Sequence, residues 1–378
     1  MRRIFLLIFA SFVPVIVAAG QTAKPVWRGT IATENGVKVV RNPKEPLFQG
    51  DVLCLQEEIS IGRGEKEGEF LFAAIGSPYS ALAVDDQGSI YVLDWKDCQI
   101  KVFAADGRFL RAFSRKGQGP GELEAPAQLF LSPKNEIVVE SMMTRTLHFF
   151  STDGRFLKRE NWSSSSAAGF SMDPHGNILG VSNGRAASGG SEYQLKLFNP
   201  KMGLIRLLEH RPKPSFSPDG IELFRPGGYV YRVMGEEFLT GFQEEYKLKT
   251  IDGAGRTRRL IENDYRPTPI TAKDVEAATK NYRSIGGGPP KWIIAKYHLP
   301  FLKFYTDEEG RIFVLTFEKT EDREKEYWDI FDQEGRYIGH QAFRSRPELW
   351  KGGKLYAIES DEDGNKYVKR YSARWLYQ

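Results

Sequence analysis

The sequence contains few of the residues that build the common metal centres and disulfide frameworks. It has 2 Cys and 5 His among 378 residues, so a cysteine-rich disulfide scaffold and a cysteine zinc site are excluded. The histidines show no His-x-x-x-His spacing, which disfavours a histidine zinc site. In an exported protein, Cys54 and Cys98 can form a disulfide, or they can remain two separate buried thiols. The sequence leaves both alternatives open.

Other function classes lack their signatures as well. The 53 Lys and Arg nearly balance the 49 Asp and Glu, for a net charge of +4, so there is no basic excess to favour nucleic acid as a partner. No Gly-x-Ser-x-Gly nucleophile motif is present. The glycine-rich stretches 62–68 and 117–121 each join two strand-like segments. Because a phosphate loop leads into a helix, these stretches are interpreted as turns, and no catalytic residue is predicted.

The amino terminus has the pattern of a secretory signal. Arg2 and Arg3 precede an apolar run over residues 4–19, which is followed by Gly20. A charged start, a short apolar run and small residues at its end are typical of a signal peptide, and the run is shorter than the ~20 residues of a membrane span. We expect residues 1–20 to be removed by cleavage after Ala19 or Gly20. The mature chain is then secreted or periplasmic and has no transmembrane span.

A repeat of about 47 residues runs through the rest of the chain. The segment Asp-Gly-Arg-Phe-Leu occurs at 106–110 and again, 47 residues later, at 153–157. At the same spacing, Gly-Ser-Ile-Tyr-Val at 88–92 corresponds to Asn-Glu-Ile-Val-Val at 135–139. Each unit contains four short apolar segments separated by Asp and Gly turns. Fixed periods of ~40–50 residues with four strands are the signature of a β-propeller blade, so an all-β propeller is predicted.

Looser copies bring the count of units to six. The third unit covers about 172–199, the fourth is degenerate over 229–253, and the fifth and sixth start near 306 and 353. The sixth unit lacks an outer strand, and the apolar segment Leu53–Ile61 precedes the first unit without a partner. Because ring closure removes the sheet edges, we expect this segment to complete the sixth blade. The predicted propeller spans residues 51–378.

Two segments fall outside the repeat. Within residues 21–50, the dipeptide Asn35-Gly36 between β-branched runs predicts a hairpin, which would form an extra strand pair outside the ring. Within residues 264–300, Thr271 and Asp274 form a capping-box-like start, and apolar residues follow at helical spacing. A short helical insertion between blades four and five is therefore predicted. It could act as a lid on the binding face or as bracing, and both alternatives remain open.

The repeat motifs resemble those of a known family. Gly-Gln-Gly-Pro-Gly-Glu-Leu at 117–123, Pro126, and Asp/Gly turns followed by strands such as 90–94 are similar to NHL repeats. Over residues 51–378 the chain resembles the exported bacterial six-bladed β-propellers of that superfamily. The resemblance implies ligand or protein binding, and it transfers no catalytic residue because its motifs are structural. The Asp that ends the second strand of the repeat varies here as Asp94, Ser141, Ser182, Thr316 and Glu359.

Ligand sites of propellers usually lie at one mouth of the central channel, near the turn after the second strand of each blade. The residues predicted to bind a ligand there are Asp94, Trp95, Lys96, Arg145, Arg185, Glu244, Phe317, Glu318 and Glu359. An exposed aromatic or Arg in a loop has few structural roles, so Trp95 and Arg145 are the strongest candidates. Trp95 and Phe317 could stack on a sugar or a peptide. The remaining charges could equally be solvated loop residues.

Two functions are compatible with these features. The first is a monomeric binding module that takes a protein, peptide or glycan at the channel mouth, without nucleic acid as a partner. The alternative is a Ca²⁺-dependent hydrolase or lyase of lactonase type, since carboxylates on several blades could supply oxygen ligands without leaving a motif. The lack of a nucleophile–base pair favours binding over catalysis, and no motif indicates a cofactor.

Overall fold

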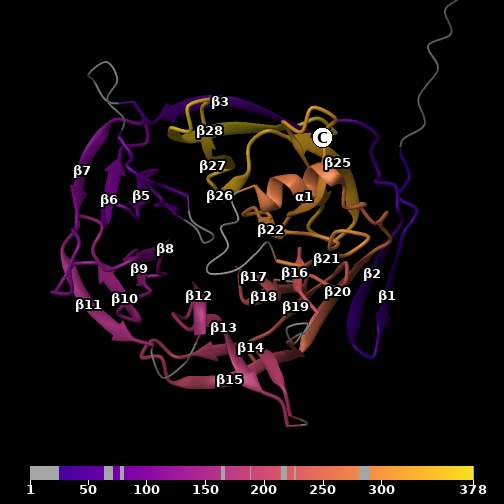
Figure 1. Ribbon diagram of the computed structural model, residues 1–378, viewed down its shortest axis with the longest axis horizontal. Helices are drawn as coiled ribbons and strands as arrows, with labels where there is room; N and C mark the ends of the chain where they lie inside the picture. The colour runs from indigo at the N-terminus through magenta and orange to yellow at the C-terminus, as the bar shows by residue number, and fades with distance from the viewer. Residues whose placement is uncertain are drawn as a thin grey trace, which may run out of the picture.

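The chain folds into a six-bladed β-propeller (Figure 1). The computed structural model describes residues 25–63, 71–76, 81–162, 167–187, 189–213, 219–224, 227–280 and 290–377. The expected signal segment, residues 1–20, lies outside these ranges. The fold class predicted from the 47-residue repeat is confirmed.

The first three blades are four-stranded antiparallel sheets in simple chain order. Blade one consists of β4 (Leu82–Val84), β5 (Ile90–Asp94), β6 (Gln99–Phe103) and β7 (Phe109–Phe113). Blade two consists of β8 (Pro126–Leu131), β9 (Ile137–Ser141), β10 (Thr146–Phe150) and β11 (Phe156–Asn161). Blade three consists of β12 (Ala167–Met172), β13 (Ile178–Arg185), β14 (Ser191–Phe198) and β15 (Leu204–Pro212).

Of the other three blades, blades four and six include strands from the amino-terminal part of the chain, whereas blade five does not. Blade four consists of β17 (Tyr229–Met234), β18 (Glu237–Phe242), β19 (Lys247–Ile251) and β20 (Thr257–Asn263), followed by β2 (Val37–Asn42) and β1 (Thr30–Glu34). Blade five consists of β22 (Lys303–Thr306), β23 (Ile312–Lys319), β24 (Glu326–Phe331) and β25 (Tyr337–Phe343). Blade six consists of β26 (Pro347–Lys351), β27 (Lys354–Ser360), β28 (Lys366–Trp375) and β3 (Leu53–Ile61).

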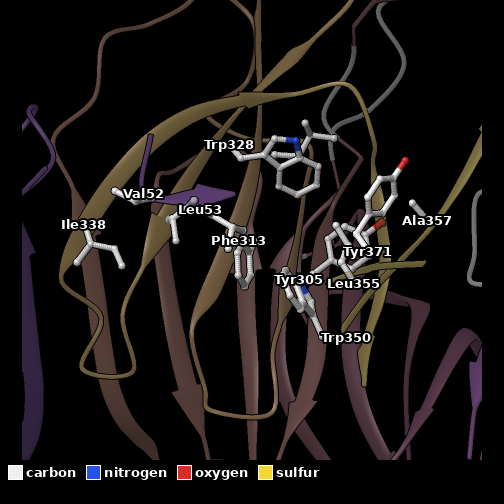
Figure 2. Close-up of a cluster of buried hydrophobic side chains, with 12 residues drawn as sticks. Val52, Leu53, Tyr305, Phe313, Trp328, Ile338, Trp350, Leu355, Ala357 and Tyr371 are labelled. Carbon is white, nitrogen blue, oxygen red and sulfur yellow. The ribbon is translucent and has the colours of Figure 1, made fainter. Parts of the chain in front are cut away.

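The ring closes through β3, as predicted from the unpartnered segment of the sequence. β3 pairs antiparallel with β28, with Leu53 opposite Trp375. Figure 2 shows the core beside this seam, in which Leu53 packs with aromatic side chains of blade five such as Phe313 and Trp328. The closing strand therefore both pairs the edge of blade six and buries apolar surface between blades five and six, which stabilises the ring.

The amino-terminal hairpin extends blade four outward. β1 and β2 pair antiparallel around Asn35 and Gly36, and β2 lies parallel to β20, outside the ring in Figure 1. From β2, residues 44–50, here called the strap, lead along the outer strand of blade five toward β3. The strap is held by backbone hydrogen bonds from Leu47 N to Tyr337 O (3.0 Å) and from Phe48 N to Ile338 O (3.1 Å).

The glycine of the repeated Asp-Gly pair permits close packing between neighbouring blades. Gly154 of blade two has a φ of +96°, and a Cβ there would lie 2.8 Å from the Phe113 ring of blade one. Gly107 of blade one likewise sits against Ile59 of β3, at 2.8 Å for the same construction. A residue with a side chain would be strained at both positions. The glycine of the repeated Asp-Gly pair is therefore required for the packing of each of these blades against the one before it.

The insertion between blades four and five contains α1 (Ala272–Thr279), the one helix among the described residues. Thr271 caps it, and the side chain of Asp274 completes the capping box, as the sequence predicted. Asp274 Oδ1 also accepts a hydrogen bond from Arg323 Nη2 in the β23–β24 turn (2.5 Å), so the helix is anchored on blade five. Within the described ranges, no helix has the length and hydropathy to cross a membrane.

A second irregular segment meets this insertion. β21 (Trp292–Ile294), at the far end of the insertion, pairs parallel with β16 (Ile221–Leu223) from the connection between blades three and four. His298 follows β21 and is buried between the rings of Phe224 and Phe317. The two connections thus brace each other and the end of β23.

Candidate functional site

The second strands of the six blades run in the same sense around the ring, so their last residues lie on one face, here called the upper face. The nine predicted ligand-binding residues belong to these strand ends or to the turns that follow. None of the nine is among the described residues that line the central channel. The reason is their radial position, because the first strand of each blade faces the channel and the second strand is one layer further out.

Asp94 has a structural environment. Its side chain is fully buried, and its oxygens accept hydrogen bonds from Ala73 N (2.7 Å) and Ala74 N (3.0 Å). Lys101 Nζ forms an ion pair with it at 2.8 Å. Because these three donors occupy the carboxylate, Asp94 fixes the loop that leads into blade one.

The equivalent residues of blades two and six also hold the segment that precedes their blade, one through a hydroxyl group and the other through a carboxylate. Ser141 Oγ donates to Glu124 O (2.6 Å) and accepts from Glu124 N (3.1 Å), just before blade two. Glu359 accepts hydrogen bonds from Tyr371 and from Ser345, which lies just before blade six. In blades one, two and six, the change among Asp94, Ser141 and Glu359 at this position is therefore variation in a structural anchor.

The two candidates of blade five have different surroundings. The Phe317 ring is half-buried and stacks on the imidazole of His298, with centroids 4.7 Å apart and planes 6° from parallel, so it packs against the insertion. Glu318 is half exposed and lines a cavity outside the central channel. Phe317 holds the insertion in place, whereas Glu318 belongs to the wall of that cavity.

The remaining candidates are exposed on the upper face. Trp95 keeps 45% of its surface exposed, and the others of this group are the charged residues Lys96, Arg145, Arg185 and Glu244. They lie on four different blades, and their assignment as rim contacts for a ligand stays a prediction.

The two cysteines are free thiols, so the disulfide alternative does not hold in this structure. Cys54 is exposed on β3 of blade six, whereas Cys98 is buried in the β5–β6 turn of blade one. The other alternative predicted two buried thiols, and it is correct for Cys98 but wrong for Cys54. Burial raises the pKa of the Cys98 thiol, which keeps it in the unreactive protonated form.

The central channel is a cavity of 720 Å³ lined by the first strands of the six blades. Its described lining carries one carboxylate, Glu348, and three cationic residues, Arg232, Lys303 and Lys351. Lys351 is paired with Asp86 at 2.7 Å. Within the described lining, cationic side chains therefore outnumber the single carboxylate.

The charged side chains of the channel are positioned and electrostatically coupled. The Arg232 guanidinium lies 4.9 Å from the Tyr305 ring centroid, and its Nη1 donates to Tyr231 O (2.8 Å). Burial raises the pKa of Glu348 to about 7, against the opposing effect of Lys303 and Arg232. Burial also lowers the pKa of Lys303. The channel therefore becomes more positive as the pH falls through neutrality.

A second cavity, here called the lateral cavity, has a volume of 290 Å³ and lies between the outer parts of blades four and five, beside the strap. Both ends of the insertion contribute to its wall, through Thr268 and Pro300. Its polar and aromatic lining includes Glu45, Phe48, Tyr246, Asn263, Tyr265 and Glu318. Of the predicted site residues, Glu318 is the one found here.

A buried carboxylate organises the floor of the lateral cavity. Asp329 on β24 accepts hydrogen bonds from Tyr246 OH (2.5 Å), Tyr337 OH (2.8 Å) and His340 Nδ1 (2.7 Å). The Tyr327 ring stacks on the His340 imidazole, with centroids 4.5 Å apart. Three tyrosine side chains from two blades therefore hold Asp329 and His340 in fixed positions.

The His340 imidazole is cationic at neutral pH. Burial disfavours its charged form, but the hydrogen bond to Asp329 and the proximity of Glu318 outweigh burial and raise the pKa of His340 to about 9. Its Nε2 lies 3.6 Å from the Glu318 carboxylate, and the same pairing lowers the pKa of Glu318. The two residues present a donor and an acceptor side by side in the cavity.

Sequence reasoning missed both cavities for identifiable reasons. Arg232 lies in the segment Tyr-Val-Tyr-Arg-Val at 229–233, which forms the first strand of blade four. A charged residue within such a strand was the one signal in the sequence that could have indicated the channel site. The lateral cavity joins Tyr246 to Asp329, which are 83 residues apart, and no repeat motif connects them. No group of three or more His, Cys, Asp or Glu in the described ranges is arranged to hold a metal ion.

Comparisons with known proteins agree with the fold. The family DUF5128, described as a 6-bladed beta-propeller, matches residues 73–187. No curated protein matches the sequence. The chain is similar to a protein of Bacteroides fragilis named as a putative exported protein, with 12% identity and a TM-score of 0.54, over 89% of this chain and 99% of that one.

Two further solved structures are similar at lower scores. A member of the DUF4221 family from Bacteroides vulgatus has 12% identity and a TM-score of 0.50, over 86% of this chain and 99% of that one. A gluconolactonase from Xanthomonas campestris has 11% identity and a TM-score of 0.42, over 77% and 84%. At these identities the likeness concerns the fold alone, and the last score carries no argument about function.

Proposed function

We propose that this chain is an exported, NHL-like binding module of the periplasm or the cell exterior, which takes a segment of a protein, peptide or glycan at the mouth of the central channel. The observation that carries the proposal is the charge of the channel. Arg232 and Lys303, on two different blades, face one carboxylate, Glu348. Cations held in a narrow, partly desolvated channel attract an anionic group strongly, so the ligand is expected to carry carboxylates.

The exposed residues of the upper face extend this site outward. Trp95, Arg145 and Arg185 could contact the part of the ligand that stays outside the channel. An aromatic ring and two guanidinium groups are side chains that often contribute much of the binding energy at an interface.

The alternative, a Ca²⁺-dependent hydrolase of lactonase type, receives less support from the channel. Calcium takes six to eight oxygen ligands, including several carboxylates. The described lining of the channel supplies one carboxylate, with two cationic side chains beside it. A positive channel favours an anion over Ca²⁺, and this is why we propose binding.

The test is a titration of the mature chain with an oligoglutamate peptide and with an oligogalacturonate, at low and at physiological salt. Replacement of one cation (Arg232→Gln) should weaken binding by about tenfold, and the wild-type affinity should fall with salt. Arg108→Gln, which removes an exposed guanidinium from the β6–β7 turn, is the matched control. Equal affinities for both variants and the wild type would contradict the proposal.

A further inference from the structure

The lateral cavity has the features of a preformed binding site. Its floor is held by the Asp329 network, and the strap beside it is hydrogen-bonded to β25 through Leu47 and Phe48. Small-molecule sites are typically concave, formed in advance, and lined by aromatic groups with a few oriented polar atoms. A volume of 290 Å³ suits a ligand of about one ring.

One polar atom of this cavity lacks a partner. Asn263 is 91% buried, since 9% of its surface is exposed, and its Oδ1 has no hydrogen-bond partner in the described chain. Leaving a buried acceptor without a donor is unfavourable. Since Asn263 lines the lateral cavity, a ligand that donates a hydrogen bond there would satisfy this atom.

The cavity also offers a donor and an acceptor in fixed positions. His340 Nδ1 is bound to Asp329, and Nε2 faces a Glu318 oxygen in an ion pair at 3.6 Å, longer than a direct hydrogen bond. A ligand group between them would need to accept from His340 and donate to Glu318. A hydroxyl group does both, because it carries one donor hydrogen and two acceptor lone pairs.

The charges of the cavity argue against an ionic ligand. Among the described lining residues, the carboxylates of Glu45, Glu318 and Asp329 are matched in number by the cations Lys44, Arg266 and His340. The side chains of Phe48, Tyr246, Tyr265 and Tyr337 contribute aromatic surface. A neutral molecule with several hydroxyl groups and an apolar C–H face matches both the polar atoms and the rings.

From this geometry we infer that the lateral cavity binds a single neutral sugar residue, with hydroxyl groups on Asn263 Oδ1 and between His340 and Glu318. This site is separate from the proposed channel site, because the described residues that line the two cavities do not overlap. The inference therefore stands or falls independently of the anionic ligand of the channel.

The experiment is saturation-transfer NMR of the mature chain with glucose, galactose, mannose and N-acetylglucosamine, followed by titration of any binder. We expect at least one sugar to bind with a millimolar or tighter dissociation constant. Glu318→Gln should weaken that binding by about tenfold, because the replacement amide is a poorer acceptor and loses the charge. Glu362→Gln, an exposed carboxylate of the β27–β28 turn, should bind like the wild type.

Two further measurements fix the site and guard against misfolded variants. Asn263→Leu should abolish sugar binding while its far-UV circular dichroism and its affinity for oligoglutamate stay unchanged. Deoxy analogues of the bound sugar should bind more weakly at the hydroxyl positions that contact the cavity. The inference is overturned if none of the four sugars binds, or if binding survives Glu318→Gln and Asn263→Leu. It is also overturned if Arg232→Gln abolishes sugar binding, because that result would place the sugar in the channel.

Discussion

The central channel is lined by equivalent strands of all six blades, whereas the lateral cavity is enclosed by two blades, the strap and the ends of the insertion. The charges of the channel belong to single side chains placed on a regular frame. Two of the charges of the cavity, Asp329 and His340, belong to a hydrogen-bonded network that also joins blades four and five. A repeat fold can therefore form a binding site from side chains on equivalent strands of its blades, or from segments that have no equivalent in the other blades. In the second case, the residues of the site also contribute to the stability of the fold.

The largest expected difference between the two regions concerns stability. Asp329→Ala should lower the free energy of unfolding by about 3–5 kcal/mol, because it leaves a partly buried imidazolium and two buried tyrosine hydroxyls without their acceptor. Glu348→Ala, in the channel, should change it by about 1 kcal/mol or less. Urea denaturation of both variants measures the contrast. Similar losses for the two variants would show that the channel charges are structural as well.

The next largest difference between the lateral cavity and the channel should appear in the pH dependence of the free energy of unfolding. Because the pKa of His340 is raised to about 9, its protonation stabilises the folded chain below the unfolded-state pKa of about 6.5, and this contribution is lost as the pH rises through about 9. We expect a loss of about 3 kcal/mol between roughly pH 6 and pH 10. His340→Gln should lack this component. Parallel pH profiles for variant and wild type would contradict it.

A crossed pair of variants should then test the independence of the two sites. Arg232→Gln should weaken oligoglutamate binding by about tenfold and leave sugar binding unchanged, and Glu318→Gln should do the reverse. Isothermal titration of both ligands against both variants measures this directly. If either variant weakens the binding of both ligands, the two cavities are coupled and are not independent sites.

The smallest expected effect is the pH response of the channel. The pKa of Glu348 is raised to about 7, so this carboxyl becomes charged as the pH rises through neutrality and repels an anionic ligand. The affinity for oligoglutamate should fall about threefold between roughly pH 6 and pH 8. Glu348→Gln should keep the higher affinity throughout. A pH response that persists in this variant would point to another titrating group.

The regular part of the fold could be predicted from the sequence because each blade repeats the same local rules. Asp and Gly at 106–107 and 153–154 marked the turns, and the unpartnered segment 53–61 matched the missing strand of blade six. Asn35 and Gly36 fixed the turn of the hairpin, although its parallel pairing with β20 depends on a contact far along the chain and was not predicted.

The candidate site could be predicted only in part. The turns after the second strands do lie on one face, but Asp94 and Glu359 are occupied in holding loops of their own blades. Glu318 lines the lateral cavity because residues of the strap and of β25 lie beside it. The repeat gives no information about these neighbours. Sites made of non-equivalent segments depend on tertiary contacts, and a repeat reports only equivalent positions.

The closing strand has a consequence for the order in which the molecule can form. β3 pairs with β28, and residues bonded across this seam, such as Glu57 and Lys369, are 312 positions apart. As the chain emerges from the ribosome, β3 is available long before β28, and its edge stays unpaired until β28 has been made. Such a distant contact makes folding slow and leaves the edge exposed to other chains. The ring therefore cannot close until its carboxyl-terminal strand has been made, however early the other blades fold.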